Sequence, residues 1–290
     1  MRSEQEMMEL ILGTARGDER IRAAYMNGSR ANPHAPRDIF QDYDICYVVG
    51  ETASFRRDPA WIDRFGARLY MQFPEEGPYW SADVENCYGW LIQFADGNRL
   101  DLHVVTPARM RRDLAEERLC IKLLDKDGIL PPLSAPTDAD YWVKRPTQEQ
   151  FHCTCNEFWW CLNNVAKGLW RREIPYAMDV LNGTVRPMLV RMLEWKAGVA
   201  TGFSVSCGKS GKYLHRYLPP EDWAGLLDTY PAGEVERIWE ATLAMCDLFH
   251  RVACQVAAAL QLAYDETEAR NSLAHLRHVR TLPRDATAIY

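Results

Sequence analysis

The sequence predicts an α+β protein with two domains. Between residues 25 and 105, short apolar stretches rich in β-branched and aromatic residues are separated by turn-forming residues, as expected for strands. Beyond about residue 140, the apolar residues recur at helical spacing instead. The proline-rich stretch 129–137 (ILPPLSAPT) separates the two patterns. We therefore expect a domain with a mixed sheet at residues 1–135 and an α-helical bundle at residues 136–290.

The first elements follow from local patterns. Residues 4–22 are predicted to form an amphipathic helix, because their apolar residues fall near one face, and residues 25–27 a short strand. A glycine-serine turn at 28–29 follows, and two prolines place residues 31–38 in a loop. The apolar run at 45–49 (ICYVV) then indicates a buried strand.

Further along, residues 59–71 are predicted to form a helix. Aspartate and glycine in the segment 95–98 (ADGN) lie between strand patterns at 90–94 and 100–105, which favours a hairpin. The hairpin would place its second strand beside the strand at 45–49.

The second domain is predicted to be mostly helical. Helical periodicity covers residues 148–169, 177–195, 220–229 and a long run at 234–268. The longest apolar runs are shorter than a membrane-spanning segment, and the first ten residues are charged, without the apolar region of a signal peptide. We therefore expect a cytosolic protein with no membrane partner.

Charge and cysteine content narrow the class of function. The formal net charge of −6 argues against a nucleic-acid partner, which needs a basic surface, and is compatible with a cationic substrate. Nine cysteines, an odd number, favour reduced thiols over a disulfide framework. The group at 152–155 (HCTC) with Cys161 lacks the second cysteine pair of a structural zinc site, so buried helix thiols are the favoured interpretation.

Three aspartates indicate a metal site. Asp42 and Asp44 are two residues apart at the start of a predicted strand, so both side chains point to the same face. Asp101 lies inside the apolar strand pattern at 100–105, where a buried carboxylate needs a neutralising partner. Mg²⁺ is the expected partner of such a cluster, because it prefers carboxylate ligands and keeps positions open for water and phosphates.

The turn before these aspartates completes a pattern typical of nucleotidyl transfer. Gly28 and Ser29 follow a strand, and a turn of this kind can bind phosphate through its amide groups. Alone it is a common turn. A strand, a Gly-Ser turn, an Asp-x-Asp strand start and a later strand aspartate occur in the order that a two-metal polymerase-type site needs.

The motifs at 28–32 (GSRAN), 42–45 (DYDI) and 99–103 (RLDLH) resemble those of the aminoglycoside 6-adenylyltransferases, also called streptomycin adenylyltransferases. The resemblance covers nearly the whole chain. It continues at 123–128 (LLDKDG), 158–160 (FWW), 177–179 (AMD) and 208–214 (GKSGKYL).

The resemblance implies transfer of AMP from ATP to a streptomycin hydroxyl, with release of pyrophosphate and resistance to the antibiotic. It also implies a polymerase-β-like nucleotidyltransferase domain facing a helical one, with two Mg²⁺ ions held by the catalytic aspartates. In this scheme Ser29 and Arg30 would bind the triphosphate, although a structural arginine is an equal alternative for Arg30. Lys209 or Lys212 would reach the triphosphate across the cleft, the alternative being a solvated basic loop that lacks the Walker spacing.

A polycationic sugar substrate needs carboxylates and flat apolar walls. The carboxylate candidates are Asp179, Glu157, Asp83 and Glu85, and the aromatic candidates are Trp159, Trp160 and Tyr176. Most helical tryptophans belong to a core, and Asp179 could instead be a first-turn acid that favours the helix dipole.

The general base stays open between Asp101, Asp179 and Glu157. Two alternatives to the main prediction remain. The same core could adenylylate another small molecule or a protein side chain. It could also be a non-catalytic nucleotide-binding module, although all three metal carboxylates are present.

Overall fold

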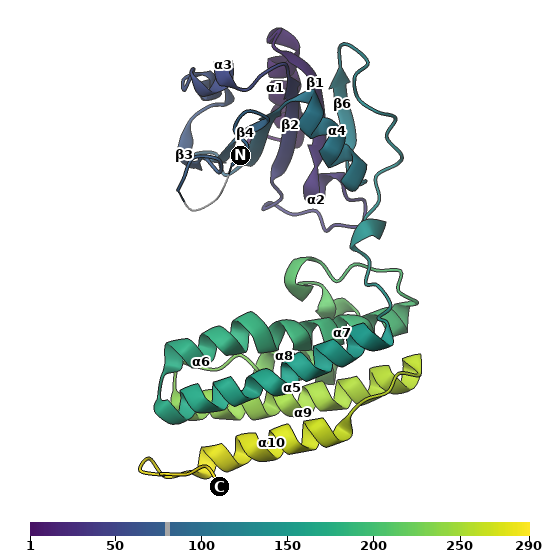
Figure 1. The fold of residues 1–290 in the computed structure, drawn as a ribbon. Coiled ribbons are helices and arrows are strands. Elements are labelled where there is room, and N and C mark those ends of the chain that lie inside the picture. Colours follow the sequence, from purple (N-terminus) through teal and green to yellow (C-terminus); the bar gives the residue numbers. More distant parts are fainter. Residues whose placement is uncertain (79–81) are drawn as a thin grey trace. The chain divides into compact units, whose positions relative to one another are not determined.

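The computed structural model describes residues 1–78 and 82–290, and the chain forms two compact units, Met1–Asp140 and Tyr141–Tyr290. We call them the sheet unit and the helical unit (Figure 1). The first contains a six-stranded sheet with short helices, and the second contains helices and connecting turns. The mixed α/β character predicted from the sequence is confirmed.

The sheet has the strand order β3-β4-β5-β2-β1-β6. Its strands are β1 (Ile21–Asn27), β2 (Tyr43–Val49), β3 (Arg68–Gln72), β4 (Cys87–Phe94), β5 (Arg99–Val105) and β6 (Ile121–Asp125). β2 and β5 are parallel, whereas the other neighbouring pairs are antiparallel. The predicted hairpin around the aspartate-glycine turn is therefore present as β4 and β5, and it places Asp101 on the strand next to β2.

Helices cover both faces of this sheet (Figure 1). The sheet unit contains α1 (Glu4–Gly17), α2 (Gly28–Ala31), α3 (Ala53–Arg56), η1 (Trp61–Phe65), α4 (Pro107–Glu116) and the short turn η2 (Ala139–Tyr141) at its end. The apolar face of α1 packs against one side of the sheet, with Met7 and Ile11 fully buried. Met110 of α4 is buried on the other side, beside Tyr25 and Val48.

Two predictions for the sheet unit were wrong. The predicted helix at 4–22 ends at Gly17, and its last two residues, Ile21 and Arg22, belong to β1, because pairing of β1 with β2 outweighs the local helical pattern. The predicted helix at 59–71 is the short 3-10 helix η1 followed by β3. Between them Gly66 has φ +108°, a conformation that a helix does not continue through.

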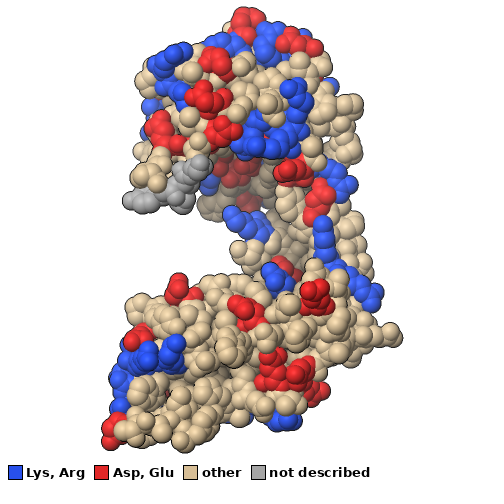
Figure 2. Space-filling view, in the orientation of Figure 1, with Lys and Arg blue, Asp and Glu red and all other residues tan. Residues whose placement is uncertain are grey.

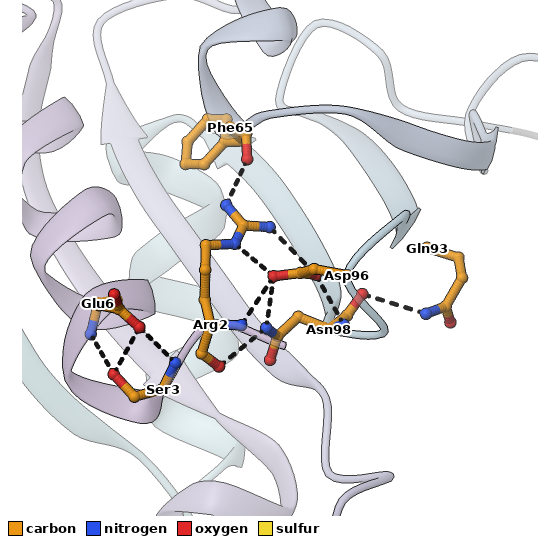
Figure 3. A network of polar contacts seen from close by, with 7 residues as sticks. All are labelled: Arg2, Ser3, Glu6, Phe65, Gln93, Asp96 and Asn98. Carbon is orange, nitrogen blue, oxygen red and sulfur yellow. Dashed lines mark hydrogen bonds and ion pairs between the residues drawn. The ribbon is translucent and has the colours of Figure 1, made fainter.

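The amino-terminal residues are tied to the β4–β5 turn (Figure 3). The Arg2 Nε donates to Asp96 Oδ2 at 2.6 Å, and the Asn98 Nδ2 donates back to the Arg2 carbonyl at 3.1 Å. Partial burial alone would raise the pKa of Asp96, but the hydrogen bonds from Arg2 and Asn98 hold it well below its usual range. Ser3 caps α1 in a reciprocal pair of hydrogen bonds with Glu6.

The helical unit is built on long helices. Its elements are α5 (Gln148–Arg171), α6 (Ile174–Val180), the π-helical turn η3 (Leu181–Val185), α7 (Arg186–Thr201), η4 (Lys209–Gly211), η5 (Leu214–Arg216), α8 (Pro220–Asp228), α9 (Val235–Leu260) and α10 (Glu266–Thr281). Thr147 begins α5 with a capping box that includes Gln150. Phe158 of α5 stacks on Phe249 of α9, with ring centroids 3.7 Å apart, at the centre of the core.

The structure changes two of the predicted helices in this unit. The run at 177–195 is interrupted by η3, and the run at 234–268 is two helices rather than one. Gln261 has φ +58° and ends α9, and the Asp265 side chain caps α10. By length and composition, α9 is long and apolar enough to cross a membrane, and half of its most apolar stretch is buried in the core of this unit.

Candidate active site

The three predicted metal carboxylates come together at the amino-terminal ends of the two central strands, β2 and β5. In the parallel pair, Asp44 of β2 lies opposite Asp101 of β5, and Asp42 comes just before β2. A ligand oxygen from each of the three lies within 4.8 Å of the others. Strand alternation orients Asp42 and Asp44 alike, and the β2–β5 register adds Asp101 to the same face.

The electrostatics of this cluster favour a cation. Burial, and then the nearby carboxylates of Asp42 and Asp101, raise the pKa of Asp44 to about 7. Arg99 offsets part of the negative charge, donating to Asp101 through Nε at 2.9 Å and through a second nitrogen at 2.6 Å. It also lies 3.7 Å from Asp42 Oδ2. One arginine leaves three carboxylates undercompensated, so the site has room for additional positive charge.

Backbone and side-chain groups of the β1–α2 turn form the other wall. Asn27 lies opposite Asp44 across the β1–β2 pair, and its Oδ1 is buried without a hydrogen-bond partner among the residues described. Gly28 has φ +75°, and a Cβ atom there would come within 1.8 Å of Asp44 Oδ2. Only a glycine allows the turn to approach the carboxylate this closely.

These groups line a cavity of about 610 Å³, which also includes Cys46, Glu75, Cys87, His103, Arg109 and Asp113. Carboxylate and amide oxygens are the ligands that Mg²⁺ prefers. The oxygen ligands of Asp42, Asp44 and Asp101, and the unpartnered Asn27 Oδ1, therefore fit Mg²⁺ in chemical type.

Ser29 and Arg30 are placed differently from each other. Ser29 is half-buried in α2, where its hydroxyl and carbonyl groups both accept from the Gln41 side chain. Arg30 is buried: its guanidinium donates to the Asp42 and Gln41 carbonyls at 3.0 Å and lies 3.8 Å over the Tyr43 ring. These contacts favour the structural alternative for Arg30, in which it holds the chain that carries Asp42.

A group that sequence reasoning missed lies next to the carboxylates. Glu75, Cys87 and His103 place ligand-type atoms within 4.8 Å of one another. His103 follows Asp101 by two residues on β5, so strand alternation could have revealed that the two share a face. Burial lowers the pKa of His103 against the opposing effect of Glu75, and burial raises the pKa of Cys87 to about 12. No sequence pattern indicated Glu75 or Cys87, because they lie 28 and 16 residues from His103 and only the tertiary structure brings them to it.

The predicted phosphate-binding lysines belong to the helical unit. Lys209 and Lys212 are exposed in and just after η4, each directly after a glycine with φ +72°, at positions 208 and 211. The Lys212 Nζ lies 5.0 Å from the centroid of the Tyr213 ring. Both ammonium groups are therefore accessible to a ligand, and their contact with the triphosphate stays a prediction.

The predicted substrate residues fall into three groups. Glu157 and Trp160 of α5, three residues apart, are exposed, as are Tyr176 and Asp179 of α6. Asp83 and Glu85 are exposed on the sheet unit, where Glu85 pairs with Arg56 at 3.2 Å. Neither is among the residues that line the cavity containing Asp44 and Asp101.

Trp159 is in a different position from the other aromatic candidates. It is 1 % exposed, and its indole Nε1 donates to the Tyr264 hydroxyl at 3.1 Å within the core. A buried tryptophan stabilises the helical unit and offers no face to a ligand, which contradicts the predicted wall role. Trp160, 67 % exposed, is the aromatic residue of this pair that a ligand could reach.

The helical unit has a cavity of its own, of about 440 Å³, lined by Lys196, Arg216, Tyr217, Gln255 and neighbouring apolar residues. Lys196 and Arg251 both pair with the fully buried Asp222, so Lys196 is already held in an ion pair. On the face shown in Figure 2, acidic and basic side chains of this unit are scattered over a largely uncharged surface. None of the predicted substrate residues is among those that line this cavity.

Comparison with known proteins places this site in a family. The streptomycin adenylyltransferase family model matches residues 1–279. An aminoglycoside 6-adenylyltransferase of Bacillus subtilis (strain 168) is 40 % identical over 268 residues, which cover 92 % of this chain and 94 % of the relative. One from Campylobacter jejuni is 39 % identical over 266 residues, covering 91 % of each chain.

A crystal structure of an aminoglycoside 6-adenyltransferase from Bacillus subtilis is 34 % identical in sequence and aligns with 97 % of this chain and 100 % of its own, with a TM-score of 0.48. The family match extends over nearly the whole sequence, including all the aspartates of the site and the glycine turn that faces them. This chain belongs to the streptomycin adenylyltransferase family.

Proposed function

We propose that this protein transfers AMP from ATP to a hydroxyl group of streptomycin, releasing pyrophosphate and inactivating the antibiotic. The observation that carries the proposal is the convergence of Asp42, Asp44 and Asp101 beside the Gly28 turn, in a chain that belongs to this family. In the reaction the substrate hydroxyl oxygen bonds to the α-phosphorus of ATP. The bond from that phosphorus to the bridging oxygen breaks, and the hydroxyl proton passes to a base.

Asp42, Asp44 and Asp101 would hold Mg²⁺, which when bound neutralises phosphate charge and lowers the pKa of the attacking hydroxyl. The register of β2 and β5 holds two of these carboxylates side by side before any ligand arrives. Arg99 keeps Asp101 oriented through its paired hydrogen bonds. A site organised in advance places the reacting groups without further reorganisation.

The phosphate contacts we propose use residues of both units. Gly28 lines the cavity and would offer its amide group, and Ser29, the next residue, would add a hydroxyl. Lys209 and Lys212 supply exposed ammonium groups on the helical unit. Arg30 acts through Asp42, whose carbonyl accepts its hydrogen bond, rather than on the nucleotide.

For the aminoglycoside, we propose contacts with the exposed carboxylates Glu157 and Asp179 and the exposed rings of Trp160 and Tyr176. Glu157 and Trp160 share one face of α5, and Tyr176 and Asp179 share one face of α6. The Tyr176 ring packs closely against α5 at Gly168. A Cβ atom at position 168 would come within 2.9 Å of the ring, so the glycine makes this approach possible. Asp101, Asp179 and Glu157 are the candidates for the base.

The experiment is a transfer assay with purified protein, ATP, Mg²⁺ and streptomycin, with pyrophosphate release and mass spectrometry of the drug as readouts. We expect streptomycin to gain the mass of one AMP group in step with pyrophosphate release. Aminoglycosides that lack the hydroxyl modified in streptomycin should gain no AMP. A panel of other hydroxyl compounds tests whether streptomycin is the preferred acceptor.

Two results would contradict the proposal in different ways. Binding of ATP that depends on Mg²⁺, without an adduct on streptomycin, would leave the nucleotidyltransferase core in place and refute the acceptor. Nucleotide binding with no pyrophosphate release for any acceptor would favour the non-catalytic nucleotide-binding module.

A further inference from the structure

A second set of ligand-type side chains lies in the sheet unit beside the aspartate cluster. Glu75 comes from the loop after β3, Cys87 begins β4, and His103 lies in β5. We call them the Glu-Cys-His cluster. All three line the cavity of about 610 Å³ that also contains Asp44 and Asp101. Their combination of oxygen, sulfur and nitrogen differs from the all-oxygen set of the aspartates.

The three ligand atoms lie within 4.8 Å of one another, and the two separations that involve Glu75 are those of a tetrahedral metal site. Glu75 Oε1 lies 3.7 Å from Cys87 Sγ and 3.7 Å from His103 Nε2. With zinc bonds of about 2.3 Å to sulfur and about 2.0–2.1 Å to nitrogen and oxygen, tetrahedral angles separate oxygen from nitrogen by about 3.4 Å and oxygen from sulfur by about 3.6 Å. The observed distances are within a few tenths of an ångström of both values.

Neighbouring groups hold two of these ligands in place. The Gly89 amide donates to Glu75 Oε2 at 2.8 Å, which orients the carboxylate and leaves Oε1 directed at the other two ligands. Gly89 also lies opposite His103 in the β4–β5 pair, where a Cβ atom would come within 2.4 Å of the imidazole. The glycine thus makes room for the ring and supplies the hydrogen bond to Glu75. In known metal sites, hydrogen bonds and packing contacts made to the ligand side chains orient those ligands toward the ion.

The chemistry of the set selects among metals. Thiolate, imidazole and carboxylate together are typical of Zn²⁺, whereas Mg²⁺ takes oxygen ligands. The side chains are largely shielded from solvent: Cys87 is 6 % exposed as a residue, and the Glu75 side chain is 14 % exposed. Three protein ligands leave a fourth tetrahedral position, and the cavity gives it access to water.

We propose that Glu75, Cys87 and His103 bind one Zn²⁺ ion, with a water molecule in the fourth position facing the cavity of the aspartate cluster. Cys87 binds as the thiolate, its proton passing to solvent, and His103 binds through Nε2. No atom changes its oxidation state. The ion is separate from the Mg²⁺ of the aspartates and adds positive charge to the same cavity.

The test uses the full-length protein, freed of metal with a chelator and titrated with Co²⁺, a spectroscopic substitute for Zn²⁺. We expect one equivalent to give the intense ligand-field bands of tetrahedral cobalt and a thiolate-to-cobalt charge-transfer band. Zn²⁺ should then abolish both on displacement. Cys87→Ser should remove the charge-transfer band, and Glu75→Gln should weaken binding on the order of 10-fold or more while leaving the thiol intact.

Matched thiol variants identify the sulfur ligand. Cys46→Ser removes another cysteine that lines the cavity, Cys120→Ser a buried thiol of the same unit, and Cys153→Ser an exposed thiol of α5. All three should keep the band. Circular dichroism and thermal melting of each variant establish that it is folded, so that loss of the band reports on the ligand.

The outcome is also independent of the proposed transferase activity. Asp44→Asn removes a carboxylate of the aspartate cluster, and the cobalt spectrum should be unchanged in that variant. The proposal is overturned if folded Cys87→Ser keeps the charge-transfer band, if Cys46→Ser loses it, or if wild-type protein gives only the weak spectrum of octahedral cobalt. Loss of the tetrahedral spectrum in Asp44→Asn would likewise assign the ion to the aspartates and overturn it.

Discussion

Asp44 is the residue on which most of the site's interactions converge. It lies opposite Asn27 of β1 and opposite Asp101 of β5, and its carboxylate lies where a Cβ atom of residue 28 would be. Its raised pKa reflects burial first and the two neighbouring carboxylates second. Bringing three carboxylates together costs free energy in the absence of a cation, so the protein gains stability from any ion that binds there.

Replacement of Asp44 with Asn should therefore change both catalysis and metal-dependent stability. We expect AMP transfer to fall on the order of 100-fold or more, because the metal loses a ligand. In wild-type protein, free Mg²⁺ at about ten times its dissociation constant should raise the free energy of unfolding by about 1.4 kcal/mol. Urea unfolding with and without Mg²⁺ measures this gain, which the variant should largely lose.

A surface carboxylate provides the control for that prediction. Asp58→Asn alters an exposed residue of the same unit and should leave both the rate and the Mg²⁺ effect unchanged. An Asp44→Asn protein with wild-type turnover would remove Asp44 from the catalytic site.

Gly28 is the second residue at which a small change should have a large effect. Gly28→Ala introduces a Cβ that overlaps the Asp44 carboxylate and places alanine at φ +75°. We expect a loss of roughly 1 kcal/mol or more in unfolding free energy and a fall in AMP transfer, because Asp44 must move. Assays of rate and urea unfolding on the same preparation measure both.

Gly13→Ala is the matched substitution. Gly13 lies exposed within α1, and nothing lies within 4 Å of a Cβ built there. The protein should gain about 0.5–1 kcal/mol in stability, at an unchanged rate. A Gly28→Ala variant that behaves like Gly13→Ala would show that the turn has room for a side chain.

Between elements, Asp18 connects the end of α1 to the rest of the sheet unit. Its Oδ2 accepts from the Trp61 indole at 2.9 Å and from Arg20 at 2.6 Å. The Arg20 hydrogen bond, against the opposing effect of burial, lowers the pKa of Asp18 from 3.8 to about 2. These contacts fix where the helix stops and β1 begins.

Asp18→Asn should consequently destabilise the protein in a pH-dependent way. A depressed folded-state pKa stabilises the protein above the unfolded pKa of 3.8, and this stabilisation is lost as the pH falls through about 2. After allowance for solvent screening, we expect a loss of about 1–2 kcal/mol at pH 7. Urea unfolding from pH 7 to pH 2 should show the difference from wild type shrinking towards the acid end.

Glu9→Gln, an exposed substitution on α1, should stay within about 0.5 kcal/mol of wild type at pH 7. A difference between Asp18→Asn and wild type that does not change with pH would show that Asp18 acts through packing rather than through its charge.

At the scale of the whole molecule, the two units have separate hydrophobic cores. The core of the helical unit is made of side chains from 151 to 279, and the two core clusters of the sheet unit use residues 7 to 130. Each unit therefore buries apolar surface on its own, as an independently folding domain does.

We expect the fragment 141–290 to fold without the rest of the chain. Its circular dichroism should be strongly helical, with a cooperative thermal transition, and it should transfer no AMP because the three aspartates lie in the sheet unit. A fragment with a broad, non-cooperative transition would show that the helical unit needs the sheet unit to fold.

Local pattern was sufficient for some features and insufficient for others. The 3.6-residue period of 148–169 predicted α5, and the aspartate-glycine turn predicted the β4–β5 hairpin. Ile21 and Arg22 were misassigned to a helix because their strand conformation depends on the pairing of β1 with β2. The break at Gln261 was also missed, although the capping aspartate four residues later is visible in the sequence.

Some features of the candidate site could be predicted from the sequence, and others could not. Asp42, Asp44 and Asp101 could be recognised from sequence alone, because strand alternation and a hairpin are local rules that act on neighbouring residues. The contact of Arg99 with Asp42, the closeness of Gly28 to Asp44, the burial of Trp159 and the Glu-Cys-His cluster could not. Each depends on register and packing between segments far apart in the chain, where the free energy of sheet pairing and core burial, not local preference, sets the outcome.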